Sequence, residues 1–83
     1  MRPPILIVDD DPDIRESLTD MLGHEGYLVH SAASGTDALQ QAKQTRYDAA
    51  LLDIQLPDLN GLSVLKVLME LDASLPVIIL TGN

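Results

Sequence analysis

The 83-residue sequence contains no cysteine, phenylalanine or tryptophan, and its only aromatic residues are Tyr27 and Tyr47. Without cysteine the chain forms neither a disulfide nor a thiolate metal site. The core must be built almost entirely from aliphatic side chains, which are plentiful because hydrophobic residues make up 46% of the sequence. A chain of this length is at most one domain and buries only about 60–65% of its unfolded surface.

Positive charge is also scarce. Five Lys and Arg residues stand against 13 Asp and Glu, and the net charge is −8. The basic residues are scattered along the chain, whereas binding to a phosphate backbone needs them clustered, so we expect no direct nucleic-acid contact. The apolar runs are too short to span a membrane, and the first four residues lead straight into a predicted strand rather than a signal peptide. We therefore expect no membrane contact and a cytoplasmic location.

A short apolar run, residues 48–53, ends at Asp53 and is followed by a turn rich in Pro, Asp, Asn and Gly. Runs of this length are typical of buried strands in parallel sheets. Asp53 would then lie at the carboxyl end of a strand, where open α/β sheets bind their ligands. Taken alone, an Asp in this position is more often a residue that caps a loop.

A second apolar run, near the N-terminus, stops at three consecutive carboxylates, Asp9, Asp10 and Asp11. Adjacent carboxylates repel one another unless a cation or a helix N-terminus uses them. Asp11 is predicted to cap the helix that follows, which leaves Asp9 and Asp10 without a structural role. Two acidic strand ends separated by one βα unit can bring Asp9, Asp10 and Asp53 together, and such a group of hard oxygens suits Mg²⁺.

Strands and helices are predicted to alternate, which indicates βαβ units and a parallel sheet. The expected strands are residues 4–9, 27–31, 48–53 and 77–80, and the expected helices are residues 12–22, 34–44 and 62–71. We expect Gly23 and Gly26 to end the first helix. The second helix has a thin apolar stripe and should be the least firmly packed. The third helix has a predicted core stripe of Leu62, Leu65, Leu68 and Met69.

Three stretches together resemble the receiver domain of two-component response regulators. They are Ile5-Leu6-Ile7-Val8-Asp9-Asp10, Leu51-Leu52-Asp53 with Leu56-Pro57-Asp58-Leu59-Asn60-Gly61-Leu62, and Pro76-Val77-Ile78-Ile79-Leu80-Thr81-Gly82. The resemblance runs from Pro4 to Asn83. It implies an α/β, flavodoxin-like fold, a doubly wound parallel sheet whose strand order in the family is 2-1-3-4-5.

The resemblance also implies roles for individual residues. Asp53 would accept a phosphoryl group from a sensor histidine kinase, and Thr81 would supply the switch hydroxyl that bonds it. Mg²⁺ would be held by Asp9, Asp10 and Asp53 and by the backbone carbonyl of Gln55. An output domain outside this chain, such as a DNA-binding domain, would read the change. Beyond slow self-phosphorylation from small donors and autodephosphorylation, no enzymatic activity is expected.

Members of the family continue with a fourth helix, a fifth strand and a fifth helix, so residues 1–83 are expected to be the N-terminal portion of a receiver domain. The fifth strand carries a Lys that neutralises the phosphoryl oxygens. Lys43 and Lys66 lie on predicted helices and cannot replace it, so phosphorylation of this chain by itself is expected to be impaired. The strand at 77–80 would be an unprotected sheet edge, and self-association through it is expected.

The sequence suggests three alternatives to a phosphorylated receiver domain. An EF-hand loop starting at Asp9 would need Gly and Glu where Ile14 and Asp20 stand, and this excludes it. A Mg²⁺-dependent hydrolase with an Asp nucleophile would need an acid two residues later, where Gln55 stands. A receiver-like interaction or dimerisation module that has the fold and is not phosphorylated remains open.

Overall fold

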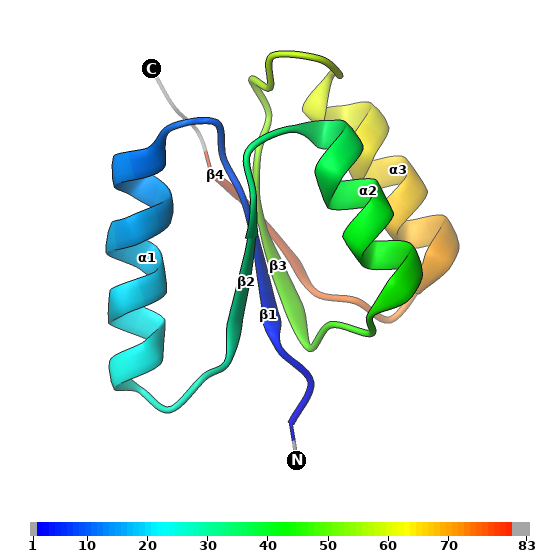
Figure 1. Cartoon of the computed structure of the whole chain (residues 1–83). Helices are drawn as coiled ribbons and strands as arrows, with labels where there is room; N and C mark the ends of the chain where they lie inside the picture. The colour runs from blue at the N-terminus through cyan, green and yellow to red at the C-terminus, as the bar shows by residue number, and fades with distance from the viewer. Residues whose placement is uncertain (1, 81–83) are drawn as a thin grey trace.

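The structure is a computed structural model that describes residues 2–80. Its strands are β1 (Ile5–Val8), β2 (Val29–Ala32), β3 (Ala49–Asp53) and β4 (Val77–Leu80), and its helices are α1 (Pro12–His24), α2 (Gly35–Gln44) and α3 (Gly61–Leu71). The strands are all parallel in the order β2-β1-β3-β4. Helix α1 lies on one face of the sheet, and α2 and α3 lie on the other (Figure 1). The predicted flavodoxin-like α/β fold is confirmed.

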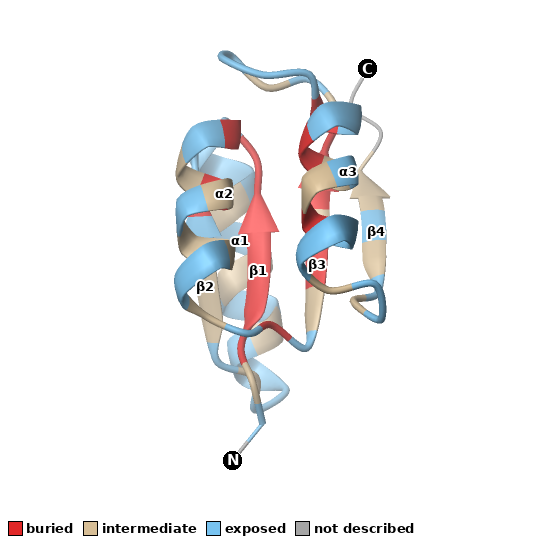
Figure 2. Ribbon diagram, turned by 90° about the vertical axis from the view of Figure 1, so that its right-hand side faces the viewer, coloured by how far each residue is buried: buried red, intermediate tan, exposed pale blue. Residues whose placement is uncertain are grey.

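The main core lies between the sheet and the layer formed by α2 and α3. Leu6 of β1 and Leu52 of β3 are completely buried, and so is Val64 of α3. All four residues of β1 are buried, and Figure 2 shows this strand in the middle of the sheet. A central parallel strand is covered on both faces, which is why its sequence is a continuous apolar run rather than an alternating one.

The opposite face of the sheet is covered more thinly. None of the residues described in α1 is buried, and Ile14 and Met21 of this helix are exposed. The prediction that α2 would be the least firmly packed helix was therefore wrong, because α2 buries Gly35 and Ala38. Small side chains let α2 approach the sheet closely, and α3 packs beside it. Within residues 2–80, α1 has no such neighbouring helix on its face of the sheet.

Two details of the helices also differ from the prediction. Helix α1 continues through Gly23 to His24, and the chain turns at Gly26, whose φ of 90° is a left-handed conformation that favours glycine. In α3 the buried side chains are Val64 and Leu68 rather than the full predicted stripe. Leu62 and Met69 of that stripe are exposed. The face of α3 that packs against the sheet and α2 is narrower than the predicted four-residue stripe.

Each helix begins with a side-chain cap at the same edge of the sheet. Asp11 caps α1 as predicted, Ser34 caps α2, and Asn60 caps α3, each accepting a hydrogen bond from a backbone amide two or three residues later. The N-termini of the helices therefore face the edge where the strands end, and their partial positive charge favours anions there. None of the helices described has the length and apolar character needed to cross a bilayer.

Candidate metal centre

The three carboxylates singled out by the sequence meet at the carboxyl ends of β1 and β3. One carboxylate oxygen each from Asp9, Asp10 and Asp53 lies within 4.8 Å of the other two. Asp9 and Asp53 are buried, whereas Asp10 is exposed, so the group opens to solvent on one side. This arrangement of oxygens can hold a metal ion, and it exists because β1 and β3 are adjacent parallel strands.

The electrostatics of this group favour a bound cation. Burial raises the pKa of Asp9 above its ordinary value, a hydrogen bond from the Asp11 amide lowers it, and the neighbouring negative charges of Asp53, Asp10 and Asp11 raise it further. The guanidinium of Arg15 donates a 2.7 Å hydrogen bond to the backbone carbonyl of Asp9. Three acids near one another are costly at neutral pH, and a divalent cation between them removes that cost.

Asp53 is fixed by the chain that follows it. Its Oδ1 atom accepts a 3.0 Å hydrogen bond from the amide of Gln55, which draws the start of the β3–α3 loop back towards the carboxylate. Gln55 also pairs with Asn60 across the loop. The structure thus places Gln55 beside Asp53, while its carbonyl as a metal ligand remains a prediction. Thr81, the predicted switch hydroxyl, lies outside the described residues.

A hollow of about 430 Å³ adjoins the carboxylates, between α1 and the end of the sheet. Asp9 and Asp53 line it, together with Leu80 of β4 and with Asp13 and Ser17 of α1. Asp13 is an exposed residue in the first turn of α1, and its place at the start of a helix that begins at the acidic edge is the signal that locates it here.

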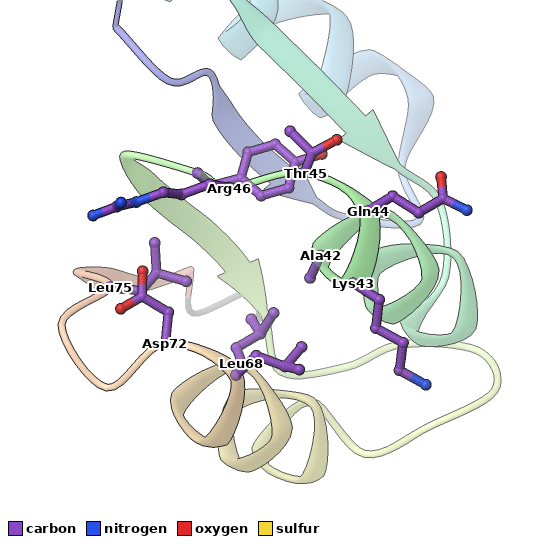
Figure 3. A pocket seen from close by; sticks show the side chains of 10 residues that line it. Ala42, Lys43, Gln44, Thr45, Arg46, Leu68, Asp72 and Leu75 are labelled. Atoms are coloured by element: carbon purple, nitrogen blue, oxygen red, sulfur yellow. The ribbon is translucent and has the colours of Figure 1, made fainter.

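A larger hollow, of about 490 Å³, lies at the C-terminal ends of α2 and α3. Figure 3 shows Lys43, Arg46 and Asp72 around it, with Leu68 and Leu75 among its apolar side chains. Among residues 2–80, Asp72 is the only carboxylate in its lining, so the hollow offers too few hard oxygens for a divalent cation. We therefore take the smaller, acidic hollow as the candidate functional site.

Comparison with protein families decides the identity of the chain. The family model described as the response regulator receiver domain matches residues 5–83. The chain belongs to the response regulator receiver family. This receiver domain is 43% identical over 81 residues to the transcriptional regulatory protein PrrA of Mycobacterium leprae, covering 98% of the chain and 35% of that relative. It is 42% identical over 83 residues to the DNA-binding response regulator MtrA of Mycolicibacterium smegmatis, covering 100% of the chain and 36% of that relative. The chain thus spans about a third of the length of these curated relatives.

Solved structures agree with this assignment. A CheY-like response regulator receiver domain protein from Methanospirillum hungatei has a TM-score of 0.96 and 36% identity, and the match covers 100% of the chain and 66% of that structure. The response regulator TrrA of Thermotoga maritima, solved in complex with Mg²⁺ and BeF, has a TM-score of 0.92 and 37% identity. That match covers 100% of the chain and 71% of the Thermotoga structure. The receiver fold and the family are therefore supported by both sequence and structure.

Proposed function

We propose that this receiver domain accepts a phosphoryl group on Asp53 from a sensor histidine kinase and relays the signal to an output domain. Mg²⁺ is held by Asp9, Asp10 and Asp53 and by the backbone carbonyl of Gln55. The observation that carries the proposal is the meeting of three carboxylates within 4.8 Å at the ends of two adjacent strands. The Thermotoga relative, solved with Mg²⁺ and BeF, supports the choice of metal.

In the proposed transfer, one oxygen of the Asp53 carboxylate attacks phosphorus and forms an acyl phosphate. The phosphorus–nitrogen bond to the kinase imidazole breaks, its electron pair goes to the imidazole nitrogen, and this nitrogen takes up one proton so that the histidine leaves as a neutral imidazole. The amide of Gln55 bonds Oδ1 of Asp53, which leaves the other oxygen to attack. When bound, Mg²⁺ would neutralise part of the negative charge on the phosphoryl oxygens. Thr81 is the proposed switch hydroxyl.

The relatives support the rest of the pathway. PrrA and MtrA are named as a transcriptional regulatory protein and a DNA-binding response regulator, so the proposed output domain binds DNA. The receiver domain itself makes no nucleic-acid contact in this proposal, consistent with its net charge of −8. We place it in the cytoplasm, as a signalling domain with at most slow self-phosphorylation and autodephosphorylation.

The proposed function is tested by the intact mass of the chain after incubation with acetyl phosphate and Mg²⁺. Because phosphorylation of this chain by itself is expected to be impaired, we expect only a fraction of the wild type to gain one phosphoryl group, and Asp53→Asn to gain none. Asp48→Asn is the matched control, because Asp48 is an exposed acid just before the same strand, and this variant should behave like the wild type. Phosphorylation that persists in Asp53→Asn would overturn the assignment of the acceptor.

A parallel titration with Mg²⁺ separates the remaining readings. If the wild type binds Mg²⁺, Asp10→Asn binds it poorly and neither is phosphorylated, the metal centre exists but residues 1–83 alone cannot complete the transfer. If neither binding nor phosphorylation is observed, the alternative function, a receiver-like interaction or dimerisation module, replaces the phosphoacceptor.

We further propose that this chain by itself associates through β4. Within residues 2–80, β4 is paired only on the side facing β3. Its sequence Val77-Ile78-Ile79-Leu80 contains no charge and no proline, the features that protect natural edge strands. Ile78 is 56% exposed, so apolar surface and unpaired backbone groups occur together on this edge.

A further inference from the structure

Asp58 ties the β3–α3 loop to a different part of the fold. Its carboxylate accepts hydrogen bonds from the Gly35 amide at 2.8 Å, the Thr36 amide at 2.9 Å and the Thr36 hydroxyl at 2.5 Å. Gly35 and Thr36 are the first residues of α2, more than 20 positions earlier in the chain. The carboxylate thus caps a helix to which its own segment does not belong.

This contact completes the cap of α2. The first amides of a helix have no partner inside it, and here those of Gly35 and Thr36 are bonded by Asp58, while that of Asp37 is bonded by Ser34. The hydrogen bond from the Thr36 hydroxyl, then those from the Thr36 and Gly35 amides, lower the pKa of Asp58 to about 2. Asp58 is therefore an anion throughout the physiological range, and an anion is favoured at a helix N-terminus.

A packing contact reinforces the same junction. A Cβ atom at Gly35 would lie 2.9 Å from Cβ of Leu59, closer than real Cβ contacts come. The loop residue after Asp58 therefore rests directly on the glycine that opens α2. Both contacts hold the middle of the β3–α3 loop against a helix that is packed into the main core.

The ends of the loop are fixed at the metal centre and at α3. Gln55 bonds Asp53 and pairs with Asn60, and Asn60 caps α3. Asp58 lies between Gln55 and Asn60, so its attachment to α2 fixes the part of the loop that neither end holds.

We propose that Asp58 is a positioning residue for the metal centre. Its hydrogen bonds attach the β3–α3 loop to α2 and thereby hold Gln55 beside Asp53. This inference rests on the proposed role of the Gln55 carbonyl as a Mg²⁺ ligand. Groups outside the ligand set that orient the ligands commonly control metal affinity. Asp58 is such a group: it orients the backbone of the loop that carries the Gln55 carbonyl, rather than a ligand side chain.

The test compares Asp58→Asn with Asp72→Asn in the full 83-residue chain. Asp72 is the matched control because it is also a carboxylate with a lowered pKa that bonds an amide and a hydroxyl, but within the turn before β4. Removing either acid changes the net charge equally. Mg²⁺ affinity is measured by titration calorimetry at constant ionic strength, and exchange of the Gln55 amide proton is measured by NMR.

We expect Asp58→Asn to weaken Mg²⁺ binding about 10-fold, the size typical of losing an outer-shell partner. The Gln55 amide should exchange faster, and Asp72→Asn should change neither quantity. Thr36→Val, which removes only the hydroxyl bond, should give a smaller change in the same direction and serves if Asp58→Asn proves poorly folded. Mg²⁺ affinity that is equal in Asp58→Asn and Asp72→Asn would overturn the proposal.

The two proposals fail in different ways. If the wild type does not bind Mg²⁺, the proposed metal centre fails, and the exchange of the Gln55 amide alone decides the positioning role. Faster exchange of the Gln55 amide proton in Asp58→Asn then supports the positioning role. Unchanged exchange in a variant that has lost the bonds to Gly35 and Thr36 refutes it.

Discussion

The amide of Gly61 donates a 2.9 Å hydrogen bond to the carbonyl of Ile54, and a Cβ atom at Gly61 would lie 2.4 Å from Cα of Ile54. The same atom would also lie 2.7 Å from the backbone carbonyl oxygen of Asp53. Only glycine allows α3 to begin this close to the end of β3. Gly61→Ala must push the loop away from Asp53, and we expect it to cost about 1–3 kcal/mol of unfolding free energy.

The measurement is urea denaturation followed by circular dichroism, with Gly23→Ala as the matched control. Gly23 lies within α1, and a Cβ atom there meets nothing within 4 Å. Replacing a helical glycine with alanine in open space should stabilise the chain by about 0.5–1 kcal/mol. The two substitutions should therefore have opposite signs. A destabilisation of the same size at both positions would show that the close approach of Gly61 to Ile54 is not what requires glycine.

A second prediction concerns the edge of the core next to β2. The Tyr47 hydroxyl lies 2.9 Å from Nδ1 of His30, and the two rings pack edge to face with centroids 5.5 Å apart. The hydroxyl also donates a 3.4 Å hydrogen bond to Oε1 of Gln41. Tyr47→Phe keeps the ring and removes both contacts of the hydroxyl, so it should lower the unfolding free energy by about 1 kcal/mol.

Tyr27→Phe is the matched control for this change. The Tyr27 ring contacts the guanidinium of Arg2 through its face, an interaction that phenylalanine retains. It should change the unfolding free energy by less than about 0.5 kcal/mol, the usual range for surface substitutions. Equal effects of Tyr47→Phe and Tyr27→Phe in thermal or urea unfolding would mean that the hydrogen bonds of the Tyr47 hydroxyl contribute nothing.

The meeting of the three carboxylates could be predicted from the sequence because these residues follow strands directly. An apolar run that stops at a carboxylate fixes both the strand and the edge at which the carboxylate lies, and adjacent parallel strands bring such edges together. Asp9, Asp10 and Asp53 were therefore found without any tertiary information. Asp11 was assigned correctly as a cap for a similar reason, since capping depends on the neighbouring residues alone.

Features that depend on contacts between distant segments were not predicted. Asp58 was read only as a turn residue, because nothing in its own segment indicates that it caps α2. The relative burial of α1 and α2 was also predicted wrongly. The number of apolar residues on a helix gives the apolar surface that is available for packing. How much of that surface is buried depends on which elements pack against the helix in the fold.

A third prediction follows from the raised pKa of Asp9. A carboxyl whose folded-state pKa is raised contributes no penalty below its ordinary value of 3.8 and destabilises the fold as pH rises through the folded-state pKa. Asp9→Asn should therefore be more stable than the wild type at pH 7 without metal. This advantage should disappear as the pH falls below 3.8.

Saturating Mg²⁺ should reverse that order at pH 7, because the metal stabilises only a chain that binds it. The measurement is the thermal midpoint of both chains from pH 3 to pH 7, with and without Mg²⁺. Glu16→Gln, on an exposed position of α1, controls for the change of one charge. An Asp9→Asn variant that is less stable than the wild type in metal-free buffer would contradict the idea that burial and neighbouring charges penalise this carboxylate.

The last prediction concerns β4. Ile78 and Leu62 are each 56% exposed, but Ile78 lies on the edge strand and Leu62 on the outer side of α3. If the chain by itself associates through β4, Ile78→Lys should shift it towards monomer in sedimentation velocity experiments at tens of micromolar, because a lysine on an edge strand opposes pairing with a second strand. Leu62→Lys adds the same charge and removes a similarly exposed side chain, so it should leave the association unchanged. A wild-type chain that is already a monodisperse monomer would refute the association, and an equal effect of both substitutions would assign it to general surface hydrophobicity rather than to the strand edge.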